Sequence, residues 1–140
     1  MNRLLRPQLF STINNLSKNA RKFHNTPRNL TIVYTKNEEW INYGIADEKN
    51  NIKIGLTKNA TEQLGEIVYI DFPFEVDDIF EKDDDIVFIE SVKATDSIRA
   101  PFNGIIKSVN RKLEDDMEIL NQDPESYLES WLVTVDKLDT

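Results

Sequence analysis

Short apolar runs separated by polar clusters follow one another along the chain from residue 31 onward. The runs are rich in Val and Ile and are bounded by Asn, Asp, Gly or Pro, a pattern that predicts β-strands. The predicted strands are residues 31–34, 52–56, 67–72, 104–110 and 131–135, of which 67–72 is expected to be buried. Residues 86–106 predict two strands joined by a tight turn, with Lys93 exposed at the tip of the turn.

A short helix is predicted between the strands at 52–56 and 67–72. Asn59 can cap its N-terminus, and Glu62, three residues later, can return a hydrogen bond to the cap. Gly65 can end the helix, because glycine adopts the left-handed backbone conformation without a steric penalty.

A second short helix is predicted over residues 111–120. Leu113, Met117 and Leu120 recur at helical spacing and give this helix an apolar face, and Pro124 ends it. A Met at this spacing is a packing residue and not a cofactor ligand.

The stretch from residue 74 to residue 85 is the most acidic part of the chain. A calcium-binding loop needs oxygen ligands at alternate positions, a central Gly and a late Glu. Residues 83–85 are consecutive Asp residues without such a Gly, so a solvated hairpin turn is the better interpretation and no metal site is expected.

The composition limits the chemistry that the chain can perform. Its 140 residues correspond to one domain, and no apolar run approaches the ~20 residues that span a bilayer. The chain has no Cys, and its one His, His24, lies in a segment that we expect to be removed. Redox or group-transfer chemistry would therefore need an attached group, because the mature chain has no dithiol and few groups that titrate near neutral pH.

The charge is distributed unevenly along the chain. Residues 1–37 carry +7 and the whole chain carries −8, so residues 38–140 carry −15. Such an acidic body repels nucleic acid and anionic membranes, and neither is expected as a partner. The charge suits basic docking faces on partner proteins, and solubility alone would explain it as well.

Residues 1–30 are typical of a mitochondrial targeting peptide. They contain Arg and no acidic residue, and four apolar residues can share one helical face, namely Leu5, Leu9, Ile13 and Leu16. Residues 21–26, Arg-Lys-Phe-His-Asn-Thr, resemble the Arg-x-Phe-x-x-Thr signal for two-step matrix processing, which would make Thr31 the mature N-terminus. A secretory signal is disfavoured because no uninterrupted apolar core exists, and a DNA-binding arm is disfavoured by the acidic body.

The sequence around Lys93 resembles a known modification site. Residues 90–94, Glu-Ser-Val-Lys-Ala, followed by Ala100-Pro101 and Asn103-Gly104, resemble the lipoyl attachment hairpin of the glycine cleavage system H proteins. Lipoyl domains of 2-oxo-acid dehydrogenases usually place Asp just before the lysine, and biotin carriers place Met on both sides. The Val and Ala that flank Lys93 fit neither of those groups and fit the H proteins.

The resemblance runs from about Thr31 to Val135. Residues 60–68 are similar to the family's Ala-x-x-x-Leu-Gly-Asp-Ile-Val, and residues 34–40 are similar to its Tyr-x-x-x-His-Glu-Trp, with Glu38 in place of His. These two segments and the Lys93 hairpin cover most of the expected mature chain.

The chain departs from the family pattern in its turns. Asp77 and Asp83 stand where the family commonly has Gly, and Asp tolerates left-handed turn geometry better than most residues. H proteins generally continue into a C-terminal helix, which we expect to be missing or reduced here.

The resemblance implies an all-β, lipoyl-domain-like fold for residues 31–140. This is a flattened β-sandwich, or barrel-sandwich hybrid, of two small antiparallel sheets with short peripheral helices. It also implies a lipoyl carrier that is not itself an enzyme. Lys93 would hold lipoate in amide linkage, and the dithiolane of this arm would supply the thiols that the chain lacks.

The implied carrier works between the enzymes of glycine cleavage. Glycine decarboxylase would transfer an aminomethyl group to the arm, a tetrahydrofolate-dependent aminomethyltransferase would take up the one-carbon unit, and dihydrolipoyl dehydrogenase would reoxidise the dithiol. Lipoylating enzymes would attach the cofactor to Lys93. We expect a monomer located in the mitochondrial matrix.

The resemblance also implies roles for residues on either side of Lys93. Glu90, Ser91 and Ala94 would help the modifying enzyme to recognise the hairpin, and ordinary strand-end polarity explains Glu90 and Ser91 equally well. Core packing is the better interpretation of both Trp residues, Trp40 and Trp131.

A cleft that protects the loaded arm would need carboxylate or amide groups. Glu39 matches the family directly, and Asn37 replaces a Ser of the family. Asp96 and Ser97 reverse the usual Ser-Asp order after the lysine. These four residues are the predicted arm cleft.

Two other functions fit the same fold. One is a docking protein that does not turn over in the glycine system, and an unmodified Lys93 would favour it. The other is a lipoyl relay, and transfer of labelled lipoate from Lys93 to dehydrogenase subunits would favour that. An enzyme with its own active site is disfavoured, because acidic residues are the only acid–base groups of the mature chain.

Overall fold

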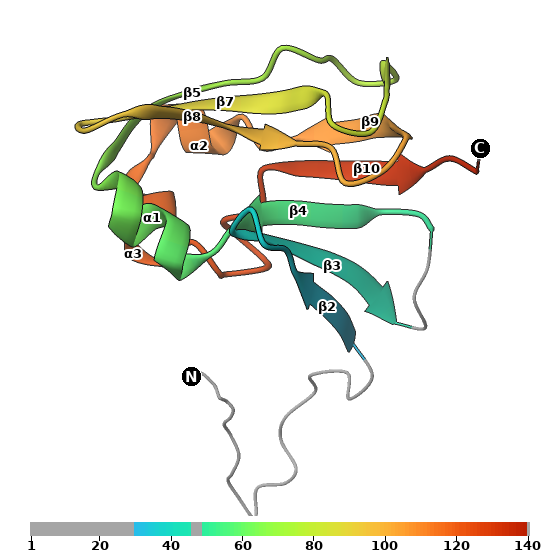
Figure 1. The fold of residues 1–140 in the computed structure, drawn as a ribbon, viewed down its shortest axis with the longest axis horizontal. Helices are drawn as coiled ribbons and strands as arrows, with labels where there is room; N and C mark the ends of the chain where they lie inside the picture. The colour runs from blue at the N-terminus through green and yellow to red at the C-terminus, as the bar shows by residue number, and fades with distance from the viewer. Residues whose placement is uncertain (1–29, 46–48, 140) are drawn as a thin grey trace, which may run out of the picture.

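Two antiparallel β-sheets stack on each other in the computed structural model, which describes residues 30–45 and 49–139 (Figure 1). The six-stranded sheet has the order β2 (Leu30–Tyr34), β3 (Glu39–Ile45), β4 (Ile52–Leu56), β10 (Val133–Lys137), β9 (Gly104–Val109) and β6 (Ile79–Phe80). The three-stranded sheet has the order β5 (Ile67–Asp71), β7 (Asp85–Ser91) and β8 (Thr95–Arg99). The predicted all-β sandwich is confirmed.

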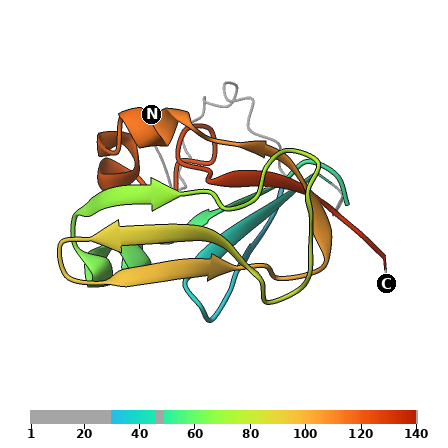
Figure 2. The same ribbon diagram turned by 90° about the horizontal axis from the view of Figure 1, so that it is seen from above.

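In the described part of the chain, three short helices lie outside the sheets: α1 (Lys58–Leu64), α2 (Lys112–Asp115) and α3 (Glu118–Gln122). In Figure 2, which looks down on the three-stranded sheet, no helix crosses the face of β5, β7 and β8 that is turned to the viewer. The helices therefore leave this outer face open.

The hydrophobic core lies between the two sheets. The large sheet contributes Ile52 and Ile54 of β4 and Val133 of β10, all fully buried. The small sheet contributes Ile70 and Ile98, which are at most 1% exposed. β-branched side chains suit this place because they pack well on a pleated surface.

Strand β5 is only half buried, so the prediction that residues 67–72 form a wholly buried strand is wrong. Ile67 and Ile70 face the core, whereas Val68 and Tyr69 are 49% and 53% exposed. The strand forms the edge of an antiparallel sheet with one face on the core and the other in solvent.

Helix α1 begins earlier in the sequence than predicted, because its N-cap is Thr57 and not Asn59. Thr57 has extended backbone angles, and its side-chain oxygen accepts a hydrogen bond from Ala60 N at 3.1 Å. Asn59 lies inside the first turn and donates to Glu38 Oε2 instead. Gly65 ends the helix with a positive φ, as expected, although its ψ of −163° lies outside the left-handed helical region.

The helix predicted over residues 111–120 is broken into α2 and α3. Asp116 has φ −142° and ψ 79°, which are not helical angles. Leu113 and Leu120 are nevertheless fully buried, and Met117 packs against the same core. The helical spacing therefore identified the packing residues correctly and missed the break.

Two turns of the same construction lie in the acidic stretch. Asp77 and Asp83 both have φ 75°, as their alignment with Gly suggested. In each turn the following Asp accepts a backbone hydrogen bond: Asp78 from Glu75 N and Asp84 from Glu81 N, both at 2.8 Å. The stretch thus holds two turns on either side of β6 and not a single hairpin turn.

The indole of Trp40 joins three segments of the chain. It is fully buried, and its Nε1 donates to the carbonyl oxygen of Pro124 at 2.9 Å. Its ring lies against the bare backbone of Gly55, where an added Cβ would be 2.4 Å from the indole. Tyr127 meets the ring edge-on at 4.7 Å between centroids.

Replacing Gly55 by Ala should destabilise the fold by about 1–3 kcal/mol or more, because a methyl group cannot fit against Trp40 without moving the ring. Equilibrium urea unfolding measures the change. The exposed Lys36→Ala is the control and should stay within about 0.5 kcal/mol of wild type. Equal stability of the Gly55 and Lys36 variants would contradict the close approach.

Candidate functional site

The hairpin of β7 and β8 places Lys93 at its tip, as predicted. Ser91 closes the turn: its backbone N donates to Ala94 O at 2.8 Å, and its hydroxyl donates to the same oxygen at 3.0 Å. The Ser91 hydroxyl oxygen also accepts from Lys93 N at 3.2 Å and from Ala94 N at 3.1 Å. Ser91 therefore shapes the turn that presents the lysine.

A second set of contacts ties the tip to the turn between α1 and β5. Val92 N donates to Glu66 O at 3.0 Å. The side chain of Lys93 lies over Gly65, where an added Cβ would be 3.4 Å from Lys93 Cε and 3.3 Å from Val92 Cγ2. Gly65 also has φ +82°, a conformation that other residues rarely adopt.

Sequence reasoning missed this role of Gly65. It identified the glycine as the end of α1, and the contact with Lys93 spans 28 positions along the chain. No local pattern signals such a contact. The Leu-Gly-x-Ile-Val segment, which follows the family so closely, was the available clue.

The amine of Lys93 is available for acylation. The residue is exposed, and its Nζ makes no hydrogen bond or ion pair with the rest of residues 30–45 and 49–139. Amide formation removes the charge of a lysine, so an amine that already holds an ion pair would lose that partner. Nothing of this kind is lost here, and the site fits an amide-linked group.

Glu90 and Ala94 flank the lysine and are both exposed. Glu90 lies opposite Thr95 in the register of the hairpin, on the outer face of the small sheet. Its carboxylate makes no ion pair within the described residues. Glu90 and Ala94 are thus open to a modifying enzyme, whereas the hydroxyl of Ser91 is occupied within the turn.

Glu39 is a buried carboxyl group between the two sheets. It is 3% exposed, accepts a hydrogen bond from the Thr35 hydroxyl at 2.9 Å, and accepts from Arg99 N of β8 at 3.4 Å. Burial raises the pKa of Glu39 above its ordinary value, and the nearby Asp96 carboxylate acts in the same direction. The two hydrogen bonds and the Arg99 charge oppose that rise without cancelling it.

The other predicted cleft residues lie in two places. Asn37 is exposed in the turn that precedes β3, where its backbone N donates to Thr35 Oγ1. Asp96 accepts from Ser97 N at 2.8 Å, and the Ser97 hydroxyl donates to Asp85 Oδ1 at 2.8 Å. Glu39 therefore approaches β8 and Asp96, and Asn37 is not joined to the hairpin by any hydrogen bond of the described residues.

A shallow hollow of about 460 Å³ lies on the outer face of the small sheet. Asp96 and Ser97 line it together with Tyr69, Phe88, Glu90 and Thr95. Glu39 and Asn37 do not line it. The four residues predicted as one cleft are thus divided among three places: Asp96 and Ser97 at this outer face, Glu39 between the sheets, and Asn37 in a separate exposed turn.

The comparison with known proteins points to one family. The family model described as "Glycine cleavage H-protein" matches residues 32–140. The chain belongs to the glycine cleavage H-protein family. Members of this family are non-catalytic lipoyl carriers of glycine cleavage, so the chain functions as a carrier and not as an enzyme.

Individual H proteins agree with this assignment. The glycine cleavage system H protein of Thermotoga maritima is 41% identical over 106 residues, which cover 76% of this chain and 80% of the relative. That of Psychrobacter sp. (strain PRwf-1) is 36% identical over 111 residues, covering 79% and 82%. The crystal structure of the H protein from Mycobacterium marinum matches with a TM-score of 0.67 and 28% identity, covering 76% of this chain and 84% of that one.

Within residues 30–45 and 49–139, no group of three or more His, Cys, Asp or Glu side chains is arranged to hold a metal ion. In the same residues, no helix has the length and apolar character needed to cross a membrane.

The raised pKa of Glu39 predicts a pH-dependent difference between wild type and Glu39→Gln. A buried carboxyl with a raised pKa stabilises the fold below about pH 4.5, its ordinary value, and loses that contribution as pH rises through the folded-state pKa. The free energy of unfolding of Glu39→Gln minus that of wild type should therefore increase from pH 4 toward neutral pH. Urea unfolding at several pH values measures it.

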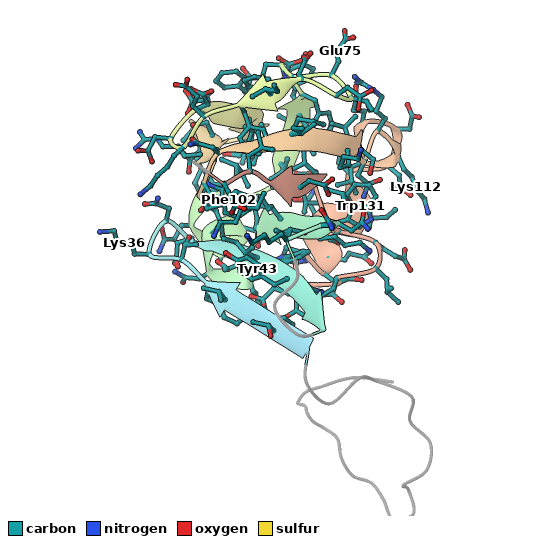
Figure 3. All side chains as sticks on the ribbon, turned by 90° about the vertical axis from the view of Figure 1, so that its right-hand side faces the viewer. Lys36, Tyr43, Glu75, Phe102, Lys112 and Trp131 are labelled. Carbon is teal, nitrogen blue, oxygen red and sulfur yellow. The ribbon has the colours of Figure 1, made fainter. Side chains whose placement is uncertain are left out.

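The matched control for this test is Glu75→Gln. Glu75 is exposed and points away from the body at the upper edge of the molecule (Figure 3). Parallel stability curves of wild type and Glu39→Gln over this pH range would refute the burial argument.

Gly65→Ala should loosen the hairpin tip, because a Cβ there meets Val92 and Lys93 and strains a backbone at φ +82° by about 1–3 kcal/mol. Hydrogen exchange of the Val92 amide, which bonds Glu66 O, should become about tenfold faster or more. Gly44→Ala is the control: it has φ +80° and no atom within 4 Å of the added Cβ. Similar protection of Val92 in both variants would contradict a specific contact.

Proposed function

We propose that this H protein carries lipoate on Lys93 and presents it to glycine decarboxylase, aminomethyltransferase and dihydrolipoyl dehydrogenase. The observation that carries the proposal is the exposed and unpaired Lys93 amine at a hairpin tip in a chain of this family. When bound, the lipoyl group supplies a disulfide–dithiol couple to a chain that contains no Cys.

The hairpin contributes by fixing the position of the amine. The Ser91 hydroxyl accepts from two backbone N–H groups of the turn, and Glu66 O accepts from Val92 N, so the backbone around Lys93 is held from both sides. A tip that stands out from a rigid sheet can enter the active site of a modifying enzyme without a change in the fold. Glu90 and Ala94, exposed on either side, are available for recognition by the lipoylating enzyme.

The acidic residues near β8 support the proposed arm cleft in part. Asp96 is exposed beside the hairpin and can attract a cationic group carried on the arm, and Ser97 lies next to it on the hollow. Glu39 lies behind them, next to Asp96 and Arg99, where it can add negative charge when ionised. Asn37 has the least structural support of the four, because it lies in a separate exposed turn.

We also propose a mitochondrial matrix location and a monomeric state. The location rests on the basic, acid-free composition of residues 1–30, of which 1–29 lie outside the described residues, and on a family match that starts at residue 32. The monomeric state is supported by the charge of −15 on residues 38–140, which repels a second copy.

Intact-mass and peptide mass spectrometry of the protein from its own cells tests the proposal. We expect a single lipoyl adduct on Lys93 and an N-terminus near Thr31. Lys93→Arg should abolish the adduct completely, because a guanidinium is not acylated by lipoylating enzymes. Lys82→Arg is the matched control, since Lys82 is also exposed in a turn, and should leave the adduct in place.

Three other results would each contradict a part of this proposal. An unmodified Lys93 in cells whose other lipoyl proteins are modified would overturn the carrier assignment and favour a docking protein. Transfer of labelled lipoate from Lys93 to dehydrogenase subunits would favour a relay. An N-terminus at Met1 in purified mitochondria would refute the processing site while leaving the carrier chemistry intact.

A further inference from the structure

The outer face of the three-stranded sheet carries two rows of outward side chains next to the Lys93 tip. The strand registers place Asp71 beside Phe88 and Phe88 beside Ser97 in one row. They place Tyr69 beside Glu90 and Glu90 beside Thr95 in the other row. Figure 2 shows this face from above, with β5 in green, β7 in yellow and β8 in orange, and no helix covers it.

Large apolar groups are exposed on this face. Tyr69 is 53% exposed and Phe88 is 42% exposed, and both line the hollow of about 460 Å³. Val92, at the tip next to Lys93, is also 63% exposed. Adjacent exposed aromatic residues that line a hollow are typical of protein interaction sites, where Tyr and Phe are enriched.

The charges on the same face are of one sign. Asp71 and Glu90 are exposed acids that make no ion pair with any described residue. Arg99, at the end of β8 away from the tip, lies 3.8 Å from Asp85. The face therefore offers uncompensated carboxylates beside open aromatic rings.

We propose that this surface, defined by Tyr69, Asp71, Phe88 and Glu90, docks an arginine-bearing face of a glycine cleavage enzyme that acts on the group at Lys93. The proposal rests on the carrier function proposed above. A guanidinium matches both features, because it stacks on aromatic rings and forms bidentate bonds with carboxylates. A second copy of this chain does not fit, because it would bring Asp71 and Glu90 against the same acids.

The surface lies next to Lys93, and this position suits the docking of an enzyme that acts on the group at Lys93. Glu90 and Val92 lie within three residues of Lys93, so an enzyme seated on the sheet has its own active site near the tip. The two rows cross the sheet one behind the other at increasing distance from the tip, which gives the partner a surface to bind while the tip stays free. Contacts of this kind raise affinity without touching the reacting group.

The experiment uses the full lipoylated chain as substrate for purified glycine decarboxylase, aminomethyltransferase and dihydrolipoyl dehydrogenase of the same organism. Two independent variants are compared with wild type: Asp71→Lys, and the double variant Tyr69→Ser with Phe88→Ser. The matched control is Glu75→Lys, which makes the same charge change in the loop beyond the far end of β5. Circular dichroism verifies the fold of each variant.

With at least one of these enzymes, both variants should raise KM about tenfold or more with kcat unchanged, and Glu75→Lys should match wild type. The wild-type KM should also rise with ionic strength, and Asp71→Lys should weaken that dependence.

Unchanged KM values with all three enzymes, in folded variants of a chain that turns over as wild type, would overturn the docking surface and leave the carrier function standing. A loss confined to the rate of lipoate attachment would also overturn it and assign the surface to the attaching enzyme. If the wild-type lipoylated chain turns over with none of the enzymes, the carrier function fails and the docking proposal fails with it.

Discussion

The contact between Trp40 and the bare backbone of Gly55 is the constraint on which much of the structure depends. It leaves no room for a side chain at Gly55, and the indole hydrogen bond to Pro124 ties the segment before β10 to the same point. With the indole on one side of β3, the preceding residue is directed to the other side, toward β8. Glu39 is therefore buried between the sheets next to Arg99 and is not displayed on the surface.

Much of the fold follows from local sequence patterns. The Val- and Ile-rich runs determine the strands, and the polar residues between two such runs determine a hairpin with Lys93 at its tip. The positive φ of Asp77 and Asp83 could also be predicted, because it belongs to each turn itself. The exposure of Val68 and Tyr69 could not, because Val68 lies at a register shift of β5 and Tyr69 lies on a sheet face that no other element covers, and a run of apolar residues reveals neither.

The candidate site likewise combines features that the local sequence predicts with features that it does not. Lys93 was identified from its neighbours in sequence, and its exposure follows from the turn. The burial of Glu39, the occupied hydroxyl of Ser91 and the position of Gly65 under the lysine arise from contacts between segments or from the detailed turn geometry. Asn37 illustrates the limit of residue-by-residue transfer, since a position can match a family motif while its turn lies apart from the hairpin.

The rigid tip has a consequence for a carrier that meets several partners in succession. The conformational entropy of residues 91–94 is lost once, when the chain folds and Ser91 and Glu66 fix the turn. It is not lost again at each encounter, so association is less unfavourable for every partner alike. A fixed tether point also confines whatever Lys93 carries to a small volume around the tip, which gives it a high effective concentration at the active site of a docked enzyme.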